Sequence, residues 1–250
     1  MTSTYNGITY FLDPESDLDR HIIENGAFEQ HLVDVAARLV PPDGVIFDIG
    51  ANAGLLSLPF AQIACDGRVF AFEPDAEMFA ALQRNVELNP LLRNRIYCHK
   101  SAVQDDPEVA CVKFNVRRYG GNRGLSSMME FICHNVKSFS VHAVTVDEMA
   151  YHAGRVDLIK IDVEGAEAKV LRGGLKALEK HKPAVIWECS NIIDQQTNTS
   201  NTEEAFALLD GLGYCQSIIQ KDGALKPLQK WHSKLNYADI LAVHPGKEVQ

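Results

Sequence analysis

Two acidic residues and a pair of glycines stand where a ligand site could form. Asp48 ends an apolar run that begins at Val45, and Gly50 and Gly54 follow it closely. Glycine lets a backbone turn sharply and approach a ligand. Glu73 ends the next apolar run, about 20 residues on, the spacing of an acid that binds ribose hydroxyls. The residues predict a nucleotide-type site at the first turn of a doubly wound α/β sheet.

The charges around this turn distinguish between two ligand classes. A dinucleotide site needs three glycines as G-x-G-x-x-G, whereas this turn has G-x-x-x-G, and no Lys or Arg lies between Val45 and Cys65. Asp48 would repel a phosphate. S-adenosylmethionine (SAM) carries a sulfonium and an ammonium and no phosphate, so an acidic strand end suits it. The turn favours SAM over NAD; the plain alternative is a glycine turn that binds nothing.

Apolar runs and helical spacing predict the elements that carry these residues. The expected strands are Val45–Phe47, Arg68–Phe72, Ile96–His99, Val156–Ile161, Ala184–Trp187, Tyr214–Ile219 and Ala238–Val243. The expected helices run from Phe28 to Leu39, from Leu55 through Ala61, from Asp75 to Leu88, from just after Glu167 to Leu178, and from Thr202 to Leu212. The polar stretch 191–201 is expected to be a loop. This order predicts a single domain over residues 1–250 with an N-terminal extension and helix over 1–40.

Residues 104–145 are predicted to be a β-hairpin insertion. Val109–Val116 and Phe139–Val144 have the pattern of strands, and the glycine-rich stretch between them is expected to be a loop. Such loops often choose the substrate. This one carries three arginines, Arg117, Arg118 and Arg123. They either bind an anionic or hydroxylated substrate or are simply solvated.

Composition limits the function classes. The formal net charge is −9 without a basic run, which argues against general nucleic-acid or membrane-surface binding. There is no 18-residue apolar run and no basic-then-apolar leader, so neither a membrane span nor a secretory signal is expected. The scattered cysteines predict mostly reduced core thiols in a cytoplasmic protein. They are Cys65, Cys98, Cys111, Cys133, Cys189 and Cys215.

Four motifs in a fixed order carry a family resemblance. FDIGANAG, VFAFEPDAEMFAALQRN, LIKIDVEGAEAKVLRGG and PAVIWE occur in turn within residues 28–188. Together they resemble the FkbM-type SAM-dependent methyltransferases. The resemblance implies the Rossmann-like class I methyltransferase fold, with a seven-stranded, mostly parallel sheet, an antiparallel last strand and helices on both faces. It also implies O-methylation of a small-molecule, sugar or natural-product hydroxyl.

The resemblance also assigns positions in the cofactor site. It places five residues of the first turn around the methionine part of SAM, namely Asp48, Gly50, Ala51, Asn52 and Gly54. Glu73 would bind the ribose hydroxyls, and Pro74 and Asp75 would begin the loop beside the adenine. Ser101 and Ala102 would lie at the adenine edge. Asp162 would face the amino-acid end or the transferred methyl group.

A hydroxyl acceptor needs a base near the methyl group. Asp162, Glu164 and Glu188 are the candidates, because each lies at or near the end of a strand. They also offer oxygen ligands for Mg²⁺, but their spacing is no metal motif, so no metal is expected. Lys160 is expected to be a buried ion-pair partner. Trp231 and Tyr237 are further candidates for the acceptor pocket.

Two other functions remain open. The protein could methylate an amine or a carboxyl group, since an amine arriving neutral needs no base. It could also be a catalytically silent SAM-binding module, although the intact glycine turn and Glu73 argue against this.

Overall fold

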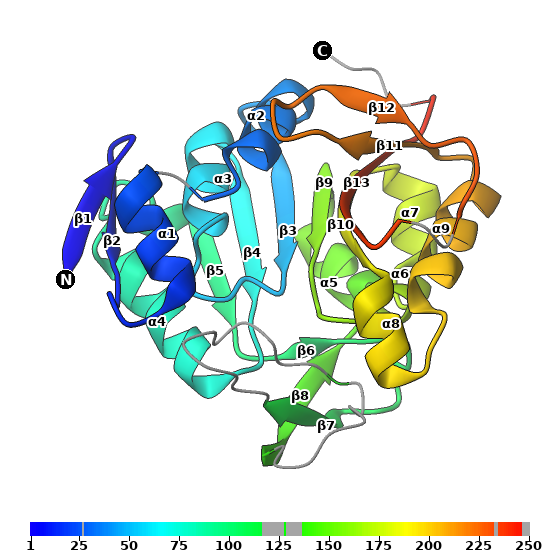
Figure 1. The fold of residues 1–250 in the computed structure, drawn as a ribbon, viewed down its shortest axis with the longest axis horizontal. Coiled ribbons are helices and arrows are strands. Elements are labelled where there is room, and N and C mark those ends of the chain that lie inside the picture. Colours follow the sequence, from blue (N-terminus) through cyan, green and yellow to red (C-terminus); the bar gives the residue numbers. More distant parts are fainter. Residues whose placement is uncertain (27, 117–127, 129–136, 233–234, 247–250) are drawn as a thin grey trace.

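An eight-stranded sheet forms the centre of the computed structural model, with strand order β12-β11-β13-β10-β9-β3-β4-β5 (Figure 1). The structure describes residues 1–26, 28–116, 128, 137–232 and 235–246. The strands of this sheet are β3 (Val45–Ile49), β4 (Arg68–Phe72), β5 (Ile96–His99), β9 (Leu158–Ile161), β10 (Ala184–Ser190), β11 (Cys215–Ile219), β12 (Leu225–Pro227) and β13 (Tyr237–Val243).

The seven expected strands have the class I methyltransferase arrangement. β5, β4, β3, β9 and β10 are parallel neighbours, and β13 inserts antiparallel between β10 and β11. β12 extends the sheet by an eighth strand at the β11 edge. The predicted fold class is confirmed, and the eighth strand is an addition to it.

Helices cover both faces of the sheet because its central strands are apolar on both sides. All five residues of β3 are buried. Phe47 and Ile49 pack with α5 (Val146–Ala153), α6 (Glu167–Arg172), α7 (Leu175–His181) and α9 (Asn201–Gly211). Ile46 packs on the opposite face with α1 (Asp17–Asn25), α2 (Gln30–Leu39), α3 (Ser57–Ile63) and α4 (Ala76–Glu87). These layers leave the strand ends free for a site.

The N-terminal extension is a separate two-stranded sheet, β1 (Thr2–Tyr5) and β2 (Ile8–Phe11), followed by α1 and α2. Two asparagines, Asn85 in α4 and Asn89 just after its end, fix β2 in place. The backbone N–H of Phe11 donates to Asn85 at 2.7 Å, and that of Thr9 donates to Asn89 at 2.9 Å. The extension is therefore attached to the layer that α4 belongs to.

The expected hairpin insertion is present. β7 (Cys111–Val116) and β8 (Lys137–Val144) are antiparallel, and the short β6 (Ala102–Val103) pairs with β8. The three loop arginines lie outside the described residues. Phe114, on β7, is buried in the small core of this sheet.

Two local predictions were wrong. The stretch 191–201 was expected to be a loop, but it contains the helix α8 (Asn191–Thr197), started by the Ser190 side chain and ended by Asn198 in a left-handed conformation. Because the sequence of α8 is mostly polar, no apolar pattern marked this stretch as a helix. The single helix expected through Leu178 is two helices, α6 and α7. They separate at Gly173, where a Cβ would lie 2.0 Å from the Gln104 carbonyl oxygen.

The described cysteines are free thiols, but most are not core residues as predicted. Cys65, Cys111 and Cys215 are exposed and Cys98 is partly buried, whereas Cys189 is buried. The reason is their position at the ends of elements rather than in apolar centres. Cys133 lies outside the described residues. Over the described ranges, no helix combines the length and the apolar character that a membrane crossing requires.

Candidate functional site

A row of charged side chains crosses one face of the sheet near the strand ends. Asp48 lies opposite Lys160, and Glu188 lies directly opposite Asp239. Side chains alternate between faces along a strand, so residues at matching positions in paired strands share a face. Lys160 is also opposite Ile186, two residues before Glu188. All four charged residues therefore project on the α2 side.

Lys160 is the cation at the centre of this row. Its Nζ lies 3.3 Å from Asp162 Oδ2 and 3.7 Å from Asp48 Oδ1, and it donates to the Gly50 carbonyl at 3.2 Å. Burial alone would lower the pKa of Lys160, but Asp162 and Asp48 together raise it. The ammonium stays charged, which confirms the expected buried ion pair.

Asp48 lies beneath the site rather than on its surface. It is fully buried, and its carboxylate accepts a 2.5 Å hydrogen bond from the Ser57 hydroxyl. Burial raises the pKa of Asp48, and Lys160 opposes this rise. The position puts the carboxylate in contact with Lys160 and α3, so it acts on a ligand only through them.

The first glycine turn is pressed against the end of β9. Gly50 has a φ of +82°, and a Cβ there would lie 1.7 Å from the Asp162 carbonyl oxygen. Asn52 also has a positive φ, of +50°, and its backbone N–H donates to Glu73 Oε2 at 2.9 Å. Positive φ in a residue other than glycine is uncommon and concentrates at functional sites. The turn is thus held by β9 on one side and by Glu73 on the other.

Glu73 joins this turn to the next one. Its Oε1 accepts from the backbone N–H of Asp75 at 2.7 Å, and Asp75 in turn caps α4, as predicted. Burial raises the pKa of Glu73 to about 8, against the lowering effect of its hydrogen bonds with Asp75 and Asn52.

A pocket opens between these turns and the hairpin insertion. Gly50, Asn52 and the segment 73–75 form one side, and the segment 162–164 forms the other. Met78 of α4 and Phe114 of β7 supply apolar walls. The free space between these residues is about 430 Å³, counting the part open to solvent.

The other predicted cofactor residues lie around the pocket without lining it. Ala51 is buried and its N–H donates to the Phe72 carbonyl. Gly54 faces α4, where a Cβ would lie 2.6 Å from Leu82 Cδ1. Ala102 is buried in β6, and the buried Ser101 hydroxyl has no hydrogen-bond partner within the described part of the chain.

The three predicted catalytic carboxylates are brought together. Asp162, Glu164 and Glu188 each offer an oxygen within 4.8 Å of those of the other two. Burial raises the pKa of Glu188 well above its usual value, and Asp162 and Glu164 raise it further. The Tyr237 hydroxyl hydrogen-bonds to Glu188. Such a cluster can hold a polar acceptor, and the expectation of no metal remains a prediction.

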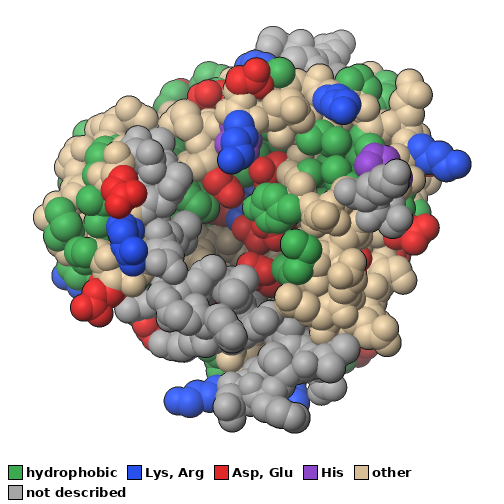
Figure 2. Space-filling view, in the orientation of Figure 1, with side chains coloured by type: hydrophobic (Ala, Val, Ile, Leu, Met, Phe, Trp, Pro, Cys, Tyr) green, Lys and Arg blue, Asp and Glu red, His purple; other side chains and the backbone are tan. Residues whose placement is uncertain are grey.

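Three residues of this region escaped the sequence reasoning. His31 Nε2 lies 3.0 Å from Asp239 Oδ2, with both side chains mostly buried. Glu29 begins α2 with a φ of +44°, and burial raises its pKa to about 8 near Lys160, Asp162 and Asp239. Only Asp239, a charge within an apolar strand, left a signal in the sequence. Figure 2 shows acidic side chains gathered in the hollow at the centre of this face.

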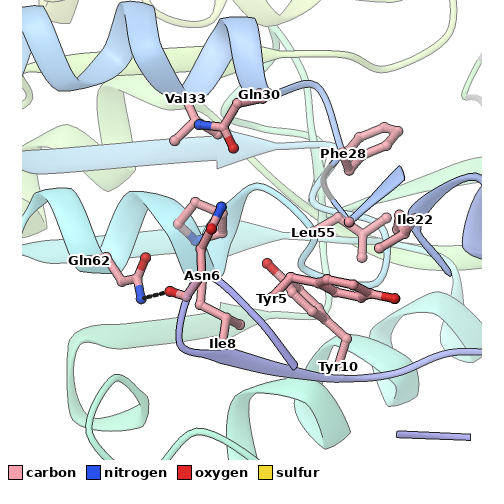
Figure 3. Close-up of a pocket in the computed structure, with 12 residues that line it drawn as sticks. Tyr5, Asn6, Ile8, Tyr10, Ile22, Phe28, Gln30, Val33, Leu55 and Gln62 are labelled. Carbon is pink, nitrogen blue, oxygen red and sulfur yellow. Dashed lines mark hydrogen bonds between the residues drawn. The ribbon is translucent and has the colours of Figure 1, made fainter. Parts of the chain in front are cut away.

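A second pocket lies between the N-terminal hairpin, the start of α2 and α3 (Figure 3). Tyr5 and Tyr10 of the N-terminal hairpin, together with Ile22, Phe28 and Leu55, give it an apolar wall. Its described lining residues include no charged side chain. It therefore lacks the acids of the first pocket, where we place the candidate site.

Comparison with known proteins agrees with this geometry. The model of the Methyltransferase FkbM domain matches residues 48–215. "Methyltransferase 1" of Beauveria bassiana is 27% identical over 239 residues, covering 88% of this chain and 91% of the relative. The 2-O-methyltransferase NoeI of Sinorhizobium fredii is 29% identical over 160 residues, covering 58% of this chain and 63% of the relative.

Among solved structures, the fibrillarin pre-rRNA processing protein of Methanococcus jannaschii superposes with a TM-score of 0.50 at 16% identity, covering 99% of this chain and 83% of that one. This likeness supports the fold alone. The family model, by contrast, spans more than half of the chain and includes the glycine turn, Glu73 and the carboxylates at the end of β9 and in β10. The chain belongs to the FkbM methyltransferase family.

Proposed function

We propose that this methyltransferase transfers a methyl group from SAM to a hydroxyl of a small molecule or glycoside. The observation that carries the proposal is the pocket that Glu73 and the carboxylates 162 and 164 line, with Lys160 as the cation beside it. Carboxylates attract the sulfonium and ammonium of SAM and repel the diphosphate of a dinucleotide.

The residues present fit the methyl donor. Glu73 can accept hydrogen bonds from both ribose hydroxyls, and Asp162 can face the ammonium of the amino-acid end. Pro74, Met78 and Phe114 offer apolar surface for the adenine. The Ser101 hydroxyl, which lacks a partner among the described residues, is a polar group left for the adenine edge.

SAM supplies a methyl group already activated by its sulfonium. The protein has to align the acceptor oxygen, and alignment can account for several kcal/mol of the barrier. Asp162, Glu164 and Glu188 stand together to bind the acceptor hydroxyl. Burial and its acidic neighbours raise the pKa of Glu188, so this group favours its protonated form, which can donate a hydrogen bond, more than an exposed glutamate does. Asp162, paired with Lys160, can accept one.

Two observations support an oxygen atom as the one that receives the methyl group. The relative NoeI is named a 2-O-methyltransferase. The acceptor side also holds several acidic groups, and general-base help is needed for a hydroxyl but not for a neutral amine. Methylation of an amine or a carboxyl group is the competing proposal.

Calorimetric titration with SAM and with NAD tests the donor. We expect SAM to bind, whereas NAD binding without SAM binding would contradict the proposal. Radiolabelled SAM with separate panels of sugars, phenols, amines and carboxylic acids then tests the acceptor. Label in an alkali-stable ether supports O-methylation; label only in an amine or an ester favours the competitor. SAM binding without transfer to any panel or to a cell extract supports a silent module.

A further inference from the structure

The start of α2 brings a histidine to the row of charged residues. His31 and Asp239 are 208 positions apart in the chain, yet their side chains meet at 3.0 Å. The side chains are 15% and 13% exposed, so the contact is shielded from water but still reachable. A shielded ion pair or hydrogen bond of this kind fixes the orientation of an imidazole ring.

The pairing of β10 with β13 places this contact beside the catalytic cluster. Asp239 is the direct partner of Glu188 across the two strands. Opposite residues in an antiparallel pair have Cβ atoms about 5 Å apart and share a face. Glu188 in turn lies within the same 4.8 Å cluster as Asp162 and Glu164, which line the pocket. His31 therefore borders the acceptor side of the site.

The ring of His31 is held at one nitrogen only. Its Nε2 contacts Asp239, and within the described ranges no second hydrogen bond to the ring is formed. A neutral imidazole that donates from Nε2 presents an unprotonated Nδ1, which accepts a proton. This is the arrangement in which a carboxylate fixes the tautomer of a general base.

The groups that face this pair are mostly acidic. Glu29 directly precedes α2, Asp48 lies in β3, Lys160 lies in β9 with Asp162 just after it, and Glu188 lies in β10, with Tyr237 beside Asp239 on β13. One lysine faces several carboxyl groups.

We propose that His31, oriented by Asp239, is the general base that takes the proton of the acceptor hydroxyl. This rests on the proposed O-methylation. The acceptor oxygen bonds to the methyl carbon, the carbon–sulfur bond breaks with its electron pair passing to sulfur, and the hydroxyl proton passes to Nδ1. The products are the methyl ether and S-adenosylhomocysteine, and the imidazolium later gives its proton to water.

The carboxylates of the cluster are less suited to this step. Asp162 is already engaged by the Lys160 ammonium at 3.3 Å. Burial and its acidic neighbours raise the pKa of Glu188 well above its usual value, so it holds a proton more strongly than an exposed glutamate. They can orient the acceptor, while His31 removes the proton.

The first test needs no acceptor. Nitrogen NMR of the histidine side chains, with His31→Gln to assign the signals, reports the tautomer at pH 8. We expect Nε2 protonated and Nδ1 unprotonated, and Asp239→Asn should change this balance. A ring protonated at Nδ1 at this pH would overturn the proposal, whatever the substrate is.

The second test uses the first alcohol of the panel to which the wild-type protein transfers the label. We expect His31→Gln to lower kcat by roughly 100-fold or more with a small change in KM, and to remove the rise of rate with pH. Asp239→Asn should lower kcat less. His152→Gln, on the exposed surface of α5, is the matched control.

The outcomes separate the two proposals. An unchanged kcat and pH profile in His31→Gln would overturn the role of His31 while leaving O-methylation in place. Transfer by the wild-type protein only to amines would overturn both. SAM affinity, measured by calorimetry, should be the same in wild type and His31→Gln, so a loss of binding would assign His31 to the donor site instead.

Discussion

The carboxylate of Glu73 accepts the backbone N–H of Asn52 at 2.9 Å, across 21 positions of sequence. This bond ties the end of β4 to a residue with positive φ in the first glycine turn. The acid that should bind the ribose is therefore also the acid that shapes the turn. The proposed ribose ligand is thus also the side chain that holds the turn in place.

Glu73→Gln should weaken SAM binding by about 1–3 kcal/mol, because charge-assisted hydrogen bonds to the ribose hydroxyls are replaced by weaker neutral ones. Since burial raises the pKa of Glu73 to about 8, binding to the wild-type protein should release a proton near pH 7. Calorimetry in two buffers of different ionisation enthalpy measures both quantities. Glu87→Gln, at an exposed position on α4, is the control. Equal SAM affinity in both variants would remove Glu73 from the site.

Stability of the ligand-free protein should fall as pH rises from about 5 to 8. Burial raises the pKa of Glu73 and Glu29 to about 8 and that of Glu167 to about 7, against 4.5 for an unburied glutamate. In this window the folded state holds more protons than the unfolded state, so the free energy of unfolding decreases with pH. Urea unfolding at several pH values measures the slope. Glu73→Gln should flatten it, and a slope of the opposite sign would contradict the burial of these acids.

Lys160→Met should destabilise the fold by about 3–5 kcal/mol, because it leaves the fully buried Asp48 without its cation. Adding Asp48→Asn to Lys160→Met should restore part of this loss. Lys176→Met, at an exposed position on α7, should stay within about 0.5 kcal/mol of wild type. Urea unfolding compares the four proteins. Equal losses in the single and double variants would mean that the ion pair is not the source.

Gly50→Ala should prevent the first turn from forming. Two features oppose an alanine at this position: the backbone φ of +82°, and the Asp162 carbonyl oxygen, which would lie only 1.7 Å from the added Cβ. Gly154 provides the matched control, since its φ is +77° but nothing lies within 4 Å of a Cβ. Gly154→Ala should therefore cost about 1–2 kcal/mol from the backbone alone. Thermal or urea unfolding, together with the SAM affinity, compares the Gly50→Ala and Gly154→Ala variants. A Gly50→Ala protein as stable as Gly154→Ala would show that the turn can move away from β9.

Local patterns explain why much of the sheet was predictable. Buried parallel strands are largely apolar runs, and a glycine or a charged residue follows them, as Gly50 follows β3 and Glu73 follows β4. Helices without an apolar stripe give no such signal. This is why the polar helix α8 was expected to be a loop. The break between α6 and α7 was missed for another reason: the apolar pattern continues across it, and the close approach of Gly173 to the Gln104 carbonyl is a tertiary contact.

The sequence by itself determined the glycine turn, the acid after the second strand and the methyltransferase family, because these lie in short motifs with fixed spacing. Only the tertiary structure decided the partners of these residues. It buried Asp48 beneath Lys160, and it brought His31 of α2 to Asp239 of β13. Such pairings depend on strand order and on the packing of a helix across the sheet, and neither leaves a local trace in the chain.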